Sequence, residues 1–257
     1  MTGSQQPWRL GLVGAALVAG LLAAFSQPPI AQGPAYHAFA DERVIGGVPN
    51  FWNVVTNLPF LLVGAFGLSR IARLLRPQLR REFVLFSTGV LLVAFGSSYY
   101  HLAPSNATLV WDRLPMTIGF MALFTLVVRD RLSESVGRRA LWPLIAVGAS
   151  SVLYWFSTEL QGQGDLRAYL VVQFLPMLLI PLILLSGAGA GGLRASWIWA
   201  TLAIYLVAKQ AESYDRALYV LTGLLSGHSL KHLVAAGAVL CAVLAALRPA
   251  SPSMPPR

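Results

Sequence analysis

The sequence predicts an all-α membrane protein, a bundle of seven transmembrane helices preceded by an additional N-terminal apolar helix. Three observations support this fold class. Hydrophobic residues make up 56% of the 257-residue chain and charged residues only 11%, whereas about a quarter of the residues are charged in a typical soluble domain. The mean hydropathy is +0.64. The apolar residues also fall into separate runs, and a run of roughly 20 residues is what a helix needs to cross a bilayer.

Residues 1–26 contain the first apolar run, which is either a cleaved signal peptide or a retained transmembrane helix that acts as a signal anchor. We expect retention, because no small-x-small cleavage site directly follows the run. Residues 27–50 are rich in Pro and Gly and are expected to form an extracytoplasmic loop. The seven-helix hydrolase domain would then span 51–248, and 249–257 would form a cytoplasmic tail.

Within the core, the remaining runs predict seven helices joined by short loops. They are expected at approximately 51–68, 83–100, 114–128, 140–157, 168–187, 196–212 and 230–247. In the first of these, Asn53 and Asn57 lie one turn apart and therefore share a helix face. Polar side chains in membrane helices normally face protein neighbours rather than lipid. We therefore expect both asparagines to be packing amides rather than ligands.

The distribution of positive charge predicts the orientation of the bundle. The formal net charge is +9, and 17 of the 19 cationic residues are arginines, most of them in short loops between apolar runs. This is typical of membrane topology, so we expect no nucleic-acid partner. A cytoplasmic N-terminus places 13 of the 17 arginines on the inside. We therefore expect an integral protein of a bacterial inner (cell) membrane with both termini in the cytoplasm.

The same alternation of helices places all four histidines on the outer side of the membrane. His228 and His232 lie about one turn apart, so both imidazoles can face one side. His101 ends another predicted helix and is the natural third ligand, whereas His37 lies in a loop. Three protein ligands and an open position are typical of catalytic zinc, whereas four are typical of structural zinc. We predict that His101, His228 and His232 hold Zn²⁺ toward the outer face, although an HxxxH pair alone is a weak signal.

Two further residues complete the predicted site. Asp112 is an ionisable residue beside a membrane helix, where charge is costly and usually functional, and its carboxylate can carry a proton to a leaving group. Ser97 precedes His101 by one turn, and its hydroxyl can hydrogen-bond an attacking water or an oxyanion. Ordinary structural roles are the alternatives: Ser97 could bond to its own helix backbone, and Asp112 could cap a helix or pair with Arg113. Four more charged residues are expected to form a solvated or ion-paired loop rim: Lys209, Glu212, Asp215 and Arg216.

These residues resemble the motifs of the alkaline ceramidase family, part of a superfamily of membrane hydrolases that includes adiponectin-receptor-like proteins. The family pattern is a Ser four residues before a His, an Asp eleven residues after that His, and a late HxxxH in the last helix. The matching residues here are Ser97, His101, Asp112, His228 and His232. The segments FWNVVTNLPF and DRLPM also resemble the starts of the first and third core helices of ceramidases. The resemblance spans about residues 41–240.

The resemblance implies a seven-helix core in which the histidines hold zinc, the Asp handles protons and the Ser stabilises the oxyanion. The implied reaction is hydrolysis of the amide in a ceramide-like N-acyl lipid to a free fatty acid and a sphingoid amine. Three positions depart from the family pattern. Thr56 replaces a Ser, Arg113 replaces the acidic residue after the motif Asp, and Asn50 replaces a Glu of the family calcium site. A family-type calcium site is therefore not expected.

Other functions fit parts of this pattern. An ester-cleaving lipid hydrolase would use the same zinc site. A seven-helix receptor or sensor would hold zinc structurally and would not need Asp112 as a proton carrier. A transporter is disfavoured, because no inverted repeat or pair of broken helices is visible. We therefore expect a zinc-dependent amidohydrolase whose substrate is a membrane lipid.

Overall fold

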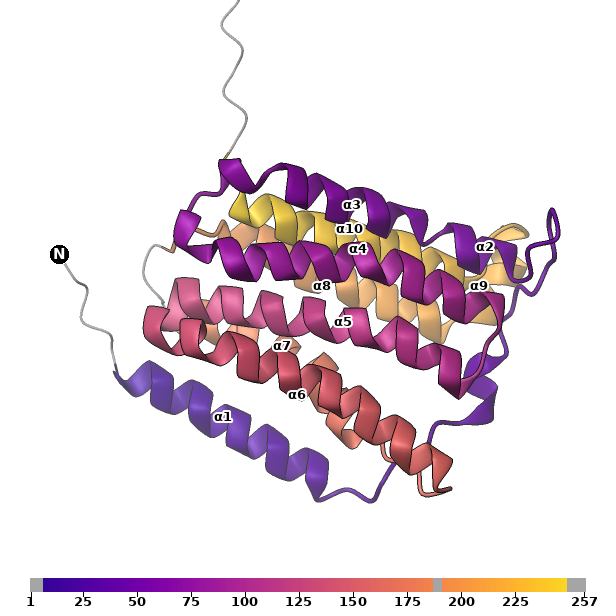
Figure 1. The fold of residues 1–257 in the computed structure, drawn as a ribbon, viewed down its shortest axis with the longest axis horizontal. Coiled ribbons are helices and arrows are strands. Elements are labelled where there is room, and N and C mark those ends of the chain that lie inside the picture. Colours follow the sequence, from indigo (N-terminus) through magenta and orange to yellow (C-terminus); the bar gives the residue numbers. More distant parts are fainter. Residues whose placement is uncertain (1–6, 187–190, 249–257) are drawn as a thin grey trace, which may run out of the picture.

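The computed structural model describes residues 7–186 and 191–248, and these residues form an all-α bundle (Figure 1). The predicted fold class is confirmed. The α-helices are α1 (Pro7–Phe25), α2 (Phe51–Val55), α3 (Leu58–Ser69), α4 (Arg80–Leu102), α5 (Asn106–Val127), α6 (Glu134–Leu160), α7 (Arg167–Leu185), α8 (Ala195–Ser213), α9 (Asp215–Thr222) and α10 (Gly227–Ala246). Four short helical turns connect them: η1 (Pro34–His37), η2 (Ile71–Arg73), η3 (Pro77–Leu79) and the π-helical η4 (Val128–Leu132). The expected tail, 249–257, lies outside the described residues.

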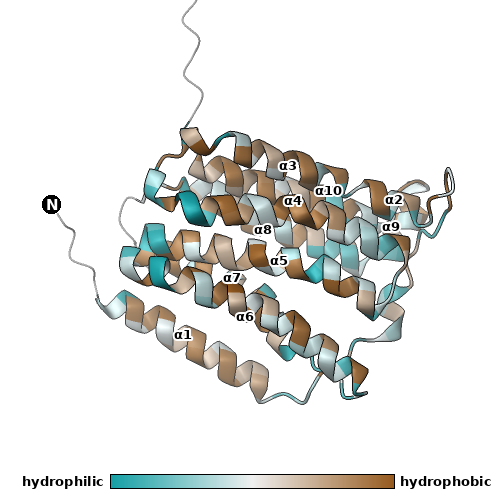
Figure 2. Ribbon diagram, viewed as in Figure 1, coloured by the Kyte–Doolittle hydropathy of each residue, from teal (hydrophilic) through white to brown (hydrophobic). Residues whose placement is uncertain are grey.

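Seven helical segments of the described chain are long and apolar enough to cross a membrane. They are α1, α2 with α3, η3 with α4, α5 with η4, α6, α7 and α10. The eighth long helix, α8, has 19 residues and lies against α10, but it is not in this group. The ribbon coloured by hydropathy is largely hydrophobic along the helices, and hydrophilic residues gather at the end where α4 begins and α5 ends (Figure 2). The chain is therefore an integral membrane protein.

Two differences from the predicted helix boundaries affect the residues near the histidines. The expected segment 51–68 breaks between α2 and α3, where Pro59 stands in the first turn of α3 because its missing N–H is tolerated there. The third core helix begins at Asn106 rather than near 114, because Ser105 and Thr108 form a reciprocal capping box. Asp112 consequently lies in the second turn of α5. The alternative that Asp112 caps a helix is wrong.

Two glycines bring α4 and α5 into backbone contact beside the site. A Cβ on Gly89 would lie 2.8 Å from the backbone nitrogen of Gly119, and a Cβ on Gly96 would overlap the carbonyl of Trp111. Small residues at helix contacts are how membrane helices approach closely without a hydrophobic driving force. This contact fixes the position of His101, at the end of α4, relative to Asp112 on α5.

A network of ion pairs, some of them buried, holds the opposite end of the bundle together. Arg129 pairs with Glu82 at 2.9 Å and with Glu134 at 2.6 Å, and Arg76 pairs with Asp130 at 2.9 Å. The Asp130 carboxylate also accepts hydrogen bonds from the backbone nitrogens of Gly192 and Leu193 before α8. The network therefore connects three loops that carry many of the arginines used to predict the orientation.

The Glu82→Gln substitution is expected to destabilise the protein by roughly 3 kcal/mol, because it leaves the buried Arg129 guanidinium without its fully buried partner. Unfolding in mixed micelles would measure this loss. The matched control is Glu134→Gln, which removes the partner whose side chain is 43% exposed and should cost less than about 1 kcal/mol. Equal losses of unfolding free energy in the two variants would show that the burial of the carboxylate does not determine how much its ion pair stabilises the protein.

Candidate metal centre

The three histidines come together at one end of the bundle. His101 lies in the last turn of α4, and His228 and His232 lie in the first two turns of α10. These helix ends lie at the same end of the molecule as the start of α5 (Figure 1). All three imidazoles are buried, with at most 6% of each residue exposed.

The three rings form an almost equilateral triangle. Their centroids are 4.9 Å apart for His101 and His228, and 5.0 Å apart for each of the other two pairs. One ring nitrogen from each residue can be chosen so that all three atoms lie within 4.8 Å of one another. No other group of three or more His, Cys, Asp or Glu side chains in the described part of the chain meets this criterion. These three histidines could therefore hold a metal ion.

Two details of hydrogen bonding fit a metal at this position. The Nδ1 atom of His101 is buried and has no hydrogen-bond partner among the described residues, which is rare for a buried polar atom and which a ligated metal ion would explain. The Thr56 hydroxyl lies 2.6 Å from the carbonyl of Trp52 and 3.0 Å from Nδ1 of His232. The hydroxyl donates its single proton to the Trp52 carbonyl. Its oxygen must therefore accept the second hydrogen bond, which makes Nδ1 of His232 the donor. The Nε2 atom of His232 is then left with a free lone pair.

Removing the Thr56 hydroxyl should therefore weaken metal binding without removing a ligand. We expect Thr56→Val to lower metal affinity by roughly 10- to 100-fold, the usual cost of losing a partner that orients a ligating histidine. Competition with a chelator would measure the change. Thr56→Ser keeps the hydroxyl and should retain affinity within a fewfold. A Thr56→Val protein that binds metal as tightly as the native chain would refute this role.

The His228 imidazole has a hydrogen-bond partner that would compete with a metal ion. The Lys231 ammonium donates a hydrogen bond to His228 Nε2 at 2.9 Å, and the same ammonium pairs with Glu212 at 3.0 Å. Lys209 pairs with the same Glu212 carboxylate. A metal on Nε2 of His228 would displace Lys231 from that lone pair, and the displaced ammonium would keep its carboxylate partner. Sequence reasoning missed this arrangement because Lys231 and Glu212 are far apart in the chain.

The Asp112 carboxylate lines the same cavity as His232 and Ser97. Both Ser97 and Asp112 are buried. Because an ionised carboxylate only accepts hydrogen bonds, Ser97 can offer its single hydroxyl proton to Asp112. The alternative that Asp112 pairs with Arg113 is wrong: the two side chains form no ion pair within 4.0 Å, and Arg113 instead bonds Gln32.

The loop of residues 27–50 covers the histidines. Phe39 packs edge-on against His101 and His228, with ring centroids 4.8 and 4.7 Å away. The Asp215 carboxylate accepts from the backbone nitrogens of both Ala40 and His228, at 2.8 and 2.7 Å, so it ties the loop to the start of α10. The loop thus shields the centre from water.

The prediction of a solvated or ion-paired loop rim formed by Lys209, Glu212, Asp215 and Arg216 is confirmed in part. Lys209 and Glu212 form an ion pair, but they line a cavity rather than a solvated rim, and Asp215 holds the covering loop. Of the four residues, only Arg216 is exposed. Lys209 and Glu212 lie near the end of α8, on a face of that helix that points into the cavity. The hydrophobic pattern alone does not show which face of that helix is buried.

Four other residues from the sequence analysis have structural roles. Asn53 and Asn57 are fully buried, and Asn53 accepts a hydrogen bond from the Ser229 hydroxyl at 2.7 Å, so the prediction that they face protein is confirmed. The Asn50 amide donates to the His101 carbonyl at 2.9 Å, a bond that the carboxylate of a Glu could not donate. His37 bonds Tyr100 and Asn106, and it is not part of the triangle.

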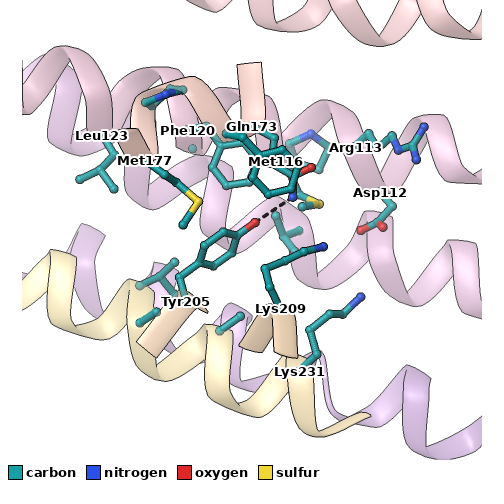
Figure 3. A pocket seen from close by; sticks show the side chains of 18 of the residues that line it. Asp112, Arg113, Met116, Phe120, Leu123, Gln173, Met177, Tyr205, Lys209 and Lys231 are labelled. Atoms are coloured by element: carbon teal, nitrogen blue, oxygen red, sulfur yellow. Dashed lines mark hydrogen bonds between the residues drawn. The ribbon is translucent and has the colours of Figure 1, made fainter. Parts of the chain in front are cut away.

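A cavity of about 310 Å³ opens beside the centre. Its polar end contains Ser97, Asp112, Lys209, Glu212, Lys231 and His232. Figure 3 shows the charged ends of Asp112, Lys209 and Lys231 directed into the same space, with Leu123 and Met177 at the opposite end. Leu123 is eleven residues beyond Asp112 on α5, so the apolar part extends roughly 16 Å along that helix. Such a cavity suits a lipid chain whose polar end lies at the histidines.

Comparison with known proteins agrees with the predicted family. A family model described as Ceramidase matches residues 44–187, which is 144 of the 257 residues and includes Ser97, His101 and Asp112. The match does not reach α10, which carries the other two histidines. No curated protein and no solved structure matches the chain. Because the matched segment is more than half of the chain, this membrane protein belongs to the ceramidase family.

Proposed function

We propose that the protein is a zinc-dependent hydrolase that cleaves the amide bond of a ceramide-like N-acyl lipid to a free fatty acid and an amine. One observation carries the proposal: three buried imidazoles converge, and one of them, His232, lines the same long cavity as the buried carboxylate of Asp112. Membership of the ceramidase family supports hydrolysis of an amide over the alternatives of an ester hydrolase or a receptor with structural zinc.

His101, His228 and His232 would hold the metal. When bound, zinc supplies a Lewis acid that polarises a carbonyl and acidifies water. An all-nitrogen donor set of three neutral imidazoles, with room beside it in the cavity, fits a catalytic zinc site. The covering loop and Phe39 keep bulk water away from the imidazoles, which strengthens electrostatic interactions in the site.

The remaining chemistry belongs to Asp112 and Ser97. The Asp112 carboxylate would accept a proton from the attacking water and deliver it to the amide nitrogen, so that the amine leaves uncharged. Ser97 lines the same cavity and would donate its single hydroxyl proton either to that carboxylate or to the oxyanion. The apolar wall from Met116 to Leu123 would hold the acyl chain.

The arginine distribution supports an orientation for this site. The loops at the end opposite the histidines carry most of the arginines, and positive loops face the cytoplasm. We therefore propose that the termini are cytoplasmic and that the metal centre faces the outer side of the membrane.

The proposed function is tested with a matched pair of lipids, an N-acyl sphingoid amide and an ester with the same acyl chain. The detergent-purified protein should release fatty acid from the amide. A chelator should abolish the release, and added Zn²⁺ should restore it. Release from the ester alone would assign the ester reaction, and release that is insensitive to the chelator would refute a metal-dependent mechanism.

A further inference from the structure

Arg113 is a buried cation without a carboxylate partner. Only 4% of the residue is exposed, and no ion pair within 4.0 Å connects it to any acidic side chain of the described residues. One guanidinium nitrogen donates to the Gln32 side chain at 2.6 Å, whereas Nη1 is buried without a hydrogen-bond partner. Glu159, the acid near this cluster, is bonded to the Gln32 backbone and the Trp155 indole instead.

Aromatic rings hold the guanidinium in place. Its central carbon lies 4.1 Å from the ring centroid of Trp155, 4.5 Å from that of Tyr169 and 5.6 Å from that of Tyr36. Burial raises the pKa of the Tyr36 phenol, so this ring remains a neutral neighbour. Stacking of this kind orients a guanidinium but does not neutralise it. A buried charge without an anion is costly, which indicates that a ligand supplies the anion.

The cavity as a whole has an excess of positive charge. Arg113, Lys209 and Lys231 line it with only two carboxylates, Asp112 and Glu212. Both lysines share the single Glu212 carboxylate, and a metal ion would add further positive charge. Gln32 and Tyr36, which contact Arg113, come from the loop at the histidine end, whereas the apolar wall runs away from it along α5. Arg113 is therefore at the headgroup side of the cavity.

We propose that Arg113 binds an anionic group on the amine side of the substrate, so that the protein acts on acidic N-acyl lipids in preference to neutral ceramides. A carboxylate, sulfonate or phosphate would each accept two parallel hydrogen bonds from a guanidinium. This inference rests on the proposed function, because it names the headgroup of the same substrate. The Arg at this position, where the alkaline ceramidase pattern has an acid, would then be the source of the specificity.

The test compares N-palmitoyl amides that differ only in the headgroup: glycine, taurine and phosphoethanolamine for the three anions, and ethanolamine as the neutral lipid. The native chain should show the highest kcat/KM for an acidic amide. Arg113→Gln should reduce the ratio of acidic to neutral kcat/KM at least about tenfold, through KM, because a charge-assisted contact is lost. Arg216→Gln, which removes an exposed charge at the same end, should leave the ratio unchanged. Equal losses for acidic and neutral amides would overturn the proposal.

Lipid binding separates this inference from the proposed function. Binding of the acidic and neutral lipids to chelator-treated protein needs no turnover, and Arg113→Gln should selectively weaken binding of the acidic lipid even if neither amide is cleaved. Palmitate inhibition tests the alternative anion, the product carboxylate: an Arg113→Gln effect on palmitate inhibition, with no effect on headgroup preference, would overturn the assignment.

Arg113→Met tests whether the residue is structural. Methionine keeps an apolar side chain against the Trp155 and Tyr169 rings and removes a buried charge that no ion pair offsets, so the variant should fold with little loss of stability. A large destabilisation would indicate a structural role.

Discussion

Asp112→Asn should abolish turnover while the protein retains its metal. We expect a loss of about 10³-fold in kcat, because the amide of asparagine cannot take a proton from water and return it to a leaving amine. The substitution keeps the shape of the side chain and its ability to accept a hydrogen bond from Ser97, so folding should be preserved. Fatty-acid release and metal content would be measured on the same preparation.

The control for this substitution is Asp165→Asn. Asp165 lies before α7, and hydrogen bonds from the Arg167 guanidinium lower the pKa of its carboxyl to about 2. It is a permanently charged carboxylate outside the cavity lining, so turnover of this variant should remain near the native rate. If Asp112→Asn loses its metal, Asp112 is a ligand. If it retains both metal and activity, the proposed proton transfer is wrong.

His228→Ala and His232→Ala should each lower metal affinity by more than about 100-fold. Each substitution leaves two imidazoles, which is one fewer than a catalytic zinc site requires. The fourth histidine is the matched control: His37 bonds Tyr100 and Asn106 rather than the triangle, so His37→Ala should keep its metal. Affinity would be measured by chelator competition.

A third substitution, Lys231→Met, tests the contact between Lys231 and His228. Lys231 occupies Nε2 of His228, so Lys231→Met should tighten metal binding if the metal uses that atom. Retention of metal in both His→Ala variants would contradict the ligand assignment. Equal affinities of native protein and Lys231→Met would show that the ammonium does not compete with the metal.

Most of the fold could be predicted from the sequence, because transmembrane helices are long apolar runs that can be recognised without knowledge of tertiary contacts. The spacing of His228 and His232, together with the side of the membrane on which His101 falls, predicted that the three histidines lie at one end of the bundle. The start of α5 was missed, because the capping box at Ser105 and Thr108 precedes the apolar run by several residues. That polar first turn places Asp112 inside a helix.

The finer parts of the site could not be predicted, because they depend on contacts between distant segments. The Thr56 contact with His232 needs the break between α2 and α3. The sharing of Glu212 by Lys209 and Lys231 needs the packing of α8 against α10. The sequence shows Arg113 only as the residue after Asp112. The aromatic rings around its guanidinium come from α6, α7 and the covering loop, and their contacts could not be predicted.

The most direct test of the central claim is the metal content of the detergent-purified protein, compared with that of His101→Ala. His101 is the ligand supplied by α4, and its unpaired Nδ1 is the buried atom that a metal would explain. We predict about one zinc per chain in the native protein and almost none in the variant, with both preparations folded. Zinc-free native protein, or equal zinc in the two, would contradict a metal centre built on these histidines.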